Sequence, residues 1–89
     1  MKSAISIVKI LNSKPLISLS WGISNLHPIK NGITMKVNGK KHKGKVQITF
    51  YHLSNFKVSF FDTNNIKKRE FIIDKEELIP FIDSIVEGE

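Results

Sequence analysis

The chain has 89 residues, of which 14 are Lys or Arg, eight are Asp or Glu and none is Cys. This length allows one small domain, and a hydrophobic content of 40% is too high for a disordered tail. The lack of cysteine excludes disulfides, thiol nucleophiles and cysteine-based metal sites, so we expect a single cytoplasmic domain over residues 1–89.

The charges are segregated along the chain. The first acidic residue is Asp62, so residues 1–61 carry ten Lys and no carboxylate, whereas residues 62–89 carry four basic residues and all eight acidic ones. The net charge of +6 therefore divides into +10 and −4. This polarity indicates a basic region and an acidic region within one small domain.

Apolar residues first recur at helical spacing. A short amphipathic helix is predicted from the spacing of Ala4, Ile7, Val8 and Leu11. We expect the segment 12–15 to end this helix. Lys9 interrupts the apolar run too early for a signal peptide, and no stretch has the length of a transmembrane helix. We therefore expect no contact with a membrane.

Alternating apolar and polar residues then predict a meander of four to five antiparallel strands. The expected strands cover residues 17–24, 33–37, 46–50, 56–60 and about 66–73. The segment 25–32 is expected to be a turn, because it contains Pro28 and the pair Asn31-Gly32. The second and third strands should form a β-hairpin around a Gly-bounded polar loop.

A C-terminal helix is expected after Asp74, which is spaced from Glu77 as in a capping box. Pro80 predicts either a kink or a helix that begins near Ile79, and Gly88 should end the helix. The apolar face comprises Leu78, Ile82, Ile85 and Val86. The resulting fold class is α+β, with a short N-terminal helix, the meander and the C-terminal helix packed on the sheet.

The hairpin also suggests an alternative fold. The spacing Asn38-Gly39, four residues, then Gly44, followed by alternating apolar residues, is similar to a fragment of Sm-like RNA-binding barrels. The resemblance is confined to this hairpin, and the second Sm signature has no counterpart in the chain. It implies a small barrel as the alternative to an open sheet.

The sequence contains no constellation typical of an enzyme. All carboxylates lie in the last third, and no nucleophile elbow, dinucleotide fingerprint or P-loop is present. His27, His42 and His52 are not spaced as ligands of a shared metal. We therefore expect a non-enzymatic protein with no cofactor, no metal site and no identified small-molecule substrate.

The hairpin tip is the segment with chemistry suited to an interaction. Its basic residues, together with a neighbouring lysine, form a candidate polyanion site of Lys36, Lys40, Lys41, His42, Lys43 and Lys45. Such a site would hold the phosphate backbone of RNA or DNA with strong salt dependence and little sequence preference. Phe61 and Tyr51 are the candidate stacking residues, with Trp21 and Phe56 as further candidates if they are exposed.

Other interpretations of the same charges remain open. The basic tip can be a solvated loop whose lysines prevent edge-to-edge pairing of hairpins. The acidic helix can be a solvated outer face, or a surface complementary to the basic tip in a homodimer or another protein–protein interaction. If the tip points away from the C-terminal helix, the polyanion hypothesis gains support, whereas contact between them would give the charges a structural role.

Overall fold

A computed structural model describes residues 4–14, 20–52 and 55–88. Helix α1 (Ala4–Asn12) precedes strands β1 (Ser24–Ile29), β2 (Gly32–Asn38), β3 (Lys43–His52), β4 (Asn55–Phe61) and β5 (Lys67–Asp74). A 3₁₀ turn, η1 (Lys75–Glu77), then leads directly into helix α3 (Leu78–Val86). The expected α+β order of helix, antiparallel strands and helix is confirmed.

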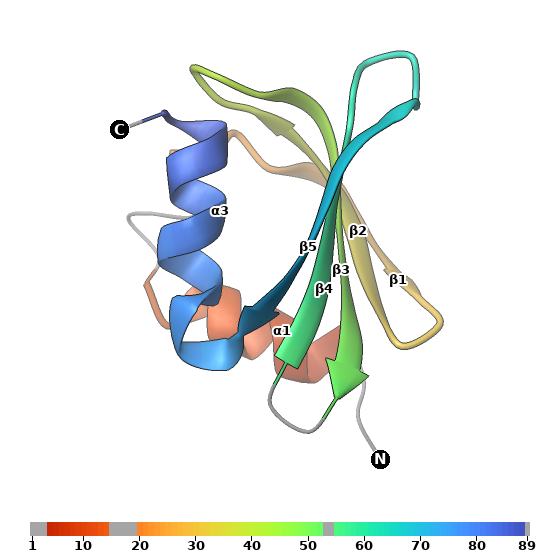
Figure 1. Cartoon of the computed structure of the whole chain (residues 1–89), viewed down its shortest axis with the longest axis vertical. Helices are drawn as coiled ribbons and strands as arrows, with labels where there is room; N and C mark the ends of the chain where they lie inside the picture. Colours follow the sequence, from red (N-terminus) through yellow and green to blue (C-terminus); the bar gives the residue numbers. More distant parts are fainter. Residues whose placement is uncertain (1–3, 15–19, 53–54, 89) are drawn as a thin grey trace.

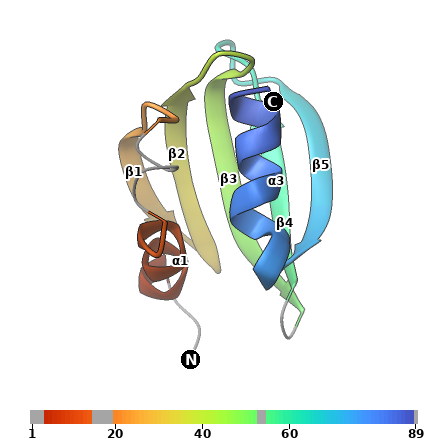
Figure 2. The ribbon, with the colours of Figure 1, turned by 90° about the vertical axis from the view of Figure 1, so that its left-hand side faces the viewer.

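The five strands form one antiparallel sheet in the order β1-β2-β3-β4-β5. The sheet is open, with β1 and β5 at its two edges, so the alternative of a closed small barrel is wrong. Both helices lie on the same side of the curved sheet, α1 across one end and α3 along β3 and β4 (Figures 1 and 2). The other face of the sheet carries no helix from the described part of the chain.

The hydrophobic core lies between the helices and the sheet. Alternation in β2, β3 and β4 directs one set of apolar side chains toward the helices, because successive residues of a strand point to opposite faces. The helices add the apolar residues that share one side of each helix. The fully or almost fully buried side chains are Ile7, Leu11, Trp21, Ile33, Met35, Val37, Val46, Ile48, Phe56, Val58, Phe60, Leu78, Ile79, Ile82 and Val86.

The expectation for the first strand was wrong. Residues 17–19 lie outside the described residues, and Trp21 to Ile23 are not a strand, whereas the segment expected to be a turn forms β1. Asn25 has a φ of 51°, Pro28 lies within the strand, and the register shifts between Ser24 and His27. An edge strand tolerates these features because only one side of its backbone must pair with a neighbour.

Trp21 connects this irregular segment to the rest of the fold. Its backbone carbonyl accepts a hydrogen bond from Asn38 N–H at 2.7 Å, beside the end of β2. Its indole Nε1–H donates to Asp83 Oδ1 at 2.9 Å, and the side chain is fully buried. The segment before β1 is thereby attached to both β2 and α3.

The start of the C-terminal helix differs from the expected capping box. β5 extends to Asp74, η1 follows, and neither Asp74 nor Glu77 makes a side-chain capping hydrogen bond. The α-helix begins at Leu78, close to the expected start near Ile79. Pro80 is then the third helical residue, where the backbone N–H has no intrahelical partner to lose.

Candidate nucleic-acid interface

The loop between β2 and β3 packs against the C-terminal end of α3. The N–H groups of Lys41 and His42 both donate to the carbonyl oxygen of Val86, at 2.8 and 3.2 Å. Lys40 N–H donates to Glu87 Oε2 at 3.3 Å. The last carbonyl groups of a helix have no intrahelical donor, and the loop supplies two donors to the carbonyl of Val86. The loop between β2 and β3 therefore lies against α3 rather than pointing away from it (Figures 1 and 2).

Two glycines allow this close approach. A Cβ atom at Gly39 would clash with the side chain and carbonyl of Val86, and one at Gly88 would clash with the aliphatic chain of Lys41. Gly88 also has a φ of 75°, the left-handed conformation that commonly ends a helix. The loop and the helix end are thus fitted to each other by the absence of side chains at the contact.

Two side chains of this segment, His42 and Lys43, are also engaged within the domain. The ring of His42 packs edge-on against Phe60, with centroids 5.4 Å apart, and Lys43 Nζ donates to Gly39 O at 3.1 Å. The lysines of the loop lie beside the negative end of the α3 dipole and near Glu87, where positive charge is stabilising. The basic loop and the end of the acidic helix thus meet within one chain, through backbone N–H groups of the loop.

The sheet face opposite the helices, called the open face below, brings other candidate residues together. Strand register aligns Lys36 of β2, Lys45 of β3 and Phe61 of β4 in one row across this face, and Lys67 of β5 continues the row. Lys45 Nζ lies 4.5 Å from the centroid of the Phe61 ring. A lysine and an aromatic ring therefore share one surface, as base-stacking and phosphate-binding groups do in single-strand binders.

A second lysine–aromatic pair lies elsewhere on the open face. Tyr51 is 57% exposed, and Lys57 Nζ lies 5.4 Å from the centroid of its ring. Lys57 was absent from the residues expected at the site. Its alternation with Phe56 and Val58 could have placed it there from the sequence.

Two of the further stacking candidates are excluded by their burial. Trp21 is fully buried and Phe56 is 3% exposed, so neither ring can reach a nucleotide base. Phe61 and Tyr51 both lie on the open face, as their alternation along the strands predicted.

A hollow of about 440 Å³ lies where the open face meets the loops at one end of the sheet. Three of the lysines expected at the site line it, Lys36, Lys43 and Lys45, whereas Lys40, Lys41 and His42 do not. Asp62 is also on the rim, and its Oδ1 accepts from two backbone N–H groups at 2.9 Å. The Ile66 N–H, above all, holds the pKa of Asp62 below its ordinary value.

Glu70 marks the β5 side of the open face. It accepts a hydrogen bond from Lys67 Nζ at 2.6 Å, and its other carboxylate oxygen lies 3.9 Å from Lys57 Nζ. The Lys67 hydrogen bond is the main cause that lowers the pKa of Glu70. Because β1 to β4 contain no Asp or Glu, Lys36 of β2 and Lys45 of β3 have no carboxylate on their own or on a neighbouring strand.

Other kinds of site find no support in the described residues. No three His, Asp or Glu side chains in ranges 4–14, 20–52 and 55–88 are grouped so that they could hold a metal ion. Within the same ranges, no helix has the length and apolar character needed to cross a membrane.

Comparison of the chain with protein-family models, with curated proteins and with solved structures gives no significant match.

Proposed function

We propose that this protein binds single-stranded nucleic acid, without strong sequence preference, through the open face of its sheet. Lys36, Lys45 and Lys57 would contact phosphates, and Phe61 and Tyr51 would stack on bases. In such a complex, each lysine ammonium would move from the aromatic ring to a phosphate, leaving the ring to a base. Lysine is suited to contacts with phosphate but lacks the planar fork with which arginine reads guanine.

The observation that carries the proposal is the pairing of a lysine with a partly exposed aromatic ring at two places on one uncovered face. An amphipathic sheet usually keeps only polar groups on its solvent side. Here the solvent side holds two aromatic rings within reach of ammonium groups, and β1 to β4 contribute no carboxylate to repel phosphate. Lys36 and Lys45 also line the hollow at one end of the face, where Asp62 lies on the rim.

The contacts of the β2–β3 loop favour this face over the loop as the binding surface. The backbone of the loop is used by the end of α3, and Lys43 is hydrogen-bonded within the loop. The carboxylate of Glu87 also lies beside Lys40 and would repel a phosphate. A phosphate that approaches the loop would therefore meet the carboxylate of Glu87 as well as the lysines.

The proposal is tested by fluorescence polarisation with a labelled oligothymidylate. We expect binding at about 50 mM salt, with an affinity that falls linearly on a log–log plot as salt rises. Tyr51→Ser should weaken binding at least about fivefold, because a stacked base contributes about 1–3 kcal/mol.

The matched control is Ile5→Ser, which removes a similarly exposed apolar side chain from α1, on the helix side of the sheet. It should leave the affinity unchanged. The absence of binding by the wild-type protein at low salt would exclude the proposed function. Equal losses in Tyr51→Ser and Ile5→Ser would exclude stacking on the open face.

A further inference from the structure

Strand β5 leaves one backbone edge without a partner in the sheet. It pairs with β4 on one side and is the last strand in the sheet order. Two lysines in its first half form ion pairs within the chain. Lys67 pairs with Glu70, and Lys68 Nζ lies 3.7 Å from Asp62 Oδ2. The second half is regular and carries Ile72, which is 46% exposed. An exposed, regular and partly apolar edge is a template for a further strand.

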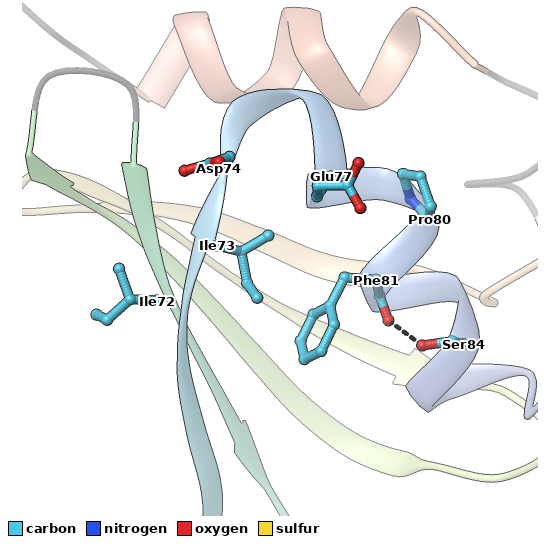
Figure 3. Close-up of a pocket in the computed structure, with 7 residues that line it drawn as sticks. All are labelled: Ile72, Ile73, Asp74, Glu77, Pro80, Phe81 and Ser84. Atoms are coloured by element: carbon cyan, nitrogen blue, oxygen red, sulfur yellow. Dashed lines mark hydrogen bonds between the residues drawn. The ribbon is translucent and has the colours of Figure 1, made fainter.

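A groove runs between this edge and α3, as Figure 3 shows. Ile73 of β5 and Phe81 of α3 face each other across it, whereas Ile72 points away to the other side of the strand. The groove has a volume of about 500 Å³, and its charged lining residues are Asp74 and Glu77, with no basic residue among those that line it. Its chemistry suits an apolar segment that carries a positive charge.

Arg69 supplies such a charge on the same strand. Its pairing with Phe60 places it on the helix side of β5, and it is exposed. Among the described residues, its guanidinium has no carboxylate partner. Arg69 lies far from the groove of its own chain, because it is four positions before Ile73 on an extended strand, roughly 13 Å away at 3.3 Å per residue.

We propose that two copies of this chain associate about a two-fold axis by antiparallel pairing of their β5 edges, each inserting Arg69 into the groove of the other. Centring the pair on Phe71 places Arg69 of one copy opposite Ile73 of its partner. The guanidinium then enters the groove that holds Glu77. The two five-stranded sheets become one continuous sheet, with the helices of both copies on the same side.

The register follows from side-chain direction and charge. Residues directly opposite each other in an antiparallel pair lie on the same face of the sheet, whereas consecutive residues of one strand lie on opposite faces. A two-fold axis must therefore pair one residue with the same residue of the other copy, and it cannot pass between two consecutive residues. An axis at Glu70 would oppose two Glu70 side chains, and an axis at Ile72 would oppose Glu70 and Asp74. The axis at Phe71 avoids both repulsions and brings Arg69 to the acidic groove, so it is the register that charge complementarity selects.

The test is a charge exchange measured by light scattering and sedimentation. The wild-type protein should be dimeric at low salt, and Arg69→Glu or Glu77→Arg alone should raise the dimer Kd at least about tenfold, since each reversal acts twice in the dimer. The double variant R69E/E77R should restore the dimer. The matched control Glu76→Arg reverses the neighbouring charge, which lines a different hollow beside α1, and should remain dimeric.

Circular dichroism checks that each variant is folded. A dimer restored in the double variant would show that the single variants lost association through charge and not through misfolding. A wild-type protein that is monomeric up to about 1 mM would overturn the proposal, because that limit corresponds to less than about 4 kcal/mol of association. A dimer that the single variants leave intact, or that the double variant fails to restore, would place the interface elsewhere. None of these outcomes depends on nucleic-acid binding.

Discussion

The backbone N–H of Lys41 donates to the carbonyl oxygen of Val86 at 2.8 Å, so the most basic loop of the chain closes the end of its last helix. The two residues are 45 positions apart, yet the contact brings together the regions of opposite charge. The lysines of the open face, Lys36, Lys45 and Lys57, take no part in this contact.

Gly39→Ala should destabilise the protein. The added methyl group would meet Val86, and the hydrogen bonds from the loop to the helix end would lengthen. We expect a loss of about 1–3 kcal/mol in the free energy of unfolding, measured by denaturant titration. Lys40→Ala, an exposed neighbour in the same loop, should change the stability by less than about 0.5 kcal/mol. Equal stability of Gly39→Ala and wild type would show that the loop does not pack on the helix in solution.

His42→Phe should leave the stability unchanged or increase it. The His42 ring packs against Phe60, and its buried Nε2 has no hydrogen-bond partner among the described residues. Replacing an unpaired buried polar atom by carbon removes a desolvation cost of about 1–3 kcal/mol while the ring contact is kept. A thermal melt of the two proteins measures the difference. A clear fall in Tm would mean that Nε2 makes a contact that stabilises the fold.

Local patterns were sufficient to predict the elements whose residues follow one periodicity. The helical spacing from Ala4 to Leu11 and the alternation of Phe56, Val58 and Phe60 both correspond to elements of the structure. β1 could not be found in this way, since Pro28 and the left-handed Asn25 are typical of turns. It is a strand because β2 offers a free edge beside it, which is a property of the assembled sheet.

The candidate site was only partly accessible from the sequence for the same reason. Alternation along β3 and β4 was enough to place Lys45, Tyr51 and Phe61 on a solvent-facing side. The packing of the loop on α3 could not be predicted in this way, because it joins segments far apart in the chain through backbone atoms. Gly39 and Gly88 are the residues that hinted at it, but each is equally consistent with an ordinary turn or helix end.

The hydrogen bond between Trp21 and Asp83 should contribute to stability through the acceptor oxygen rather than the negative charge. Asp83→Asn keeps an oxygen that can accept from Nε1 and should lose less than about 1 kcal/mol, whereas Asp83→Leu leaves the buried indole N–H unpaired and should lose about 1–3 kcal/mol. Chemical denaturation followed by tryptophan fluorescence measures both. Equal losses in the two variants would contradict the hydrogen bond as the stabilising contact.

Asp62 should make stability depend on acid pH. Its pKa is lowered in the folded protein, chiefly by the Ile66 N–H, so its contribution is fully present above the ordinary pKa and is lost as pH falls from about 4 through the lower folded value. Asp62→Asn should therefore flatten the loss of stability below about pH 4 without abolishing it, because the pKa of Glu70 is lowered as well. Superimposable acid profiles of the two proteins would refute this role.

The central claim is that the open face binds nucleic acid and the β2–β3 loop does not. It is tested most directly by comparing K36A/K45A with K40A/K41A, since each variant removes two lysines and the same charge. For a single-stranded oligonucleotide, we predict that K36A/K45A lowers the affinity at least about tenfold and reduces the salt slope by up to about 1.4, at 0.7 for each lost phosphate contact. K40A/K41A should change the affinity less than about threefold. A greater loss in K40A/K41A, or equal losses in both, would contradict the account.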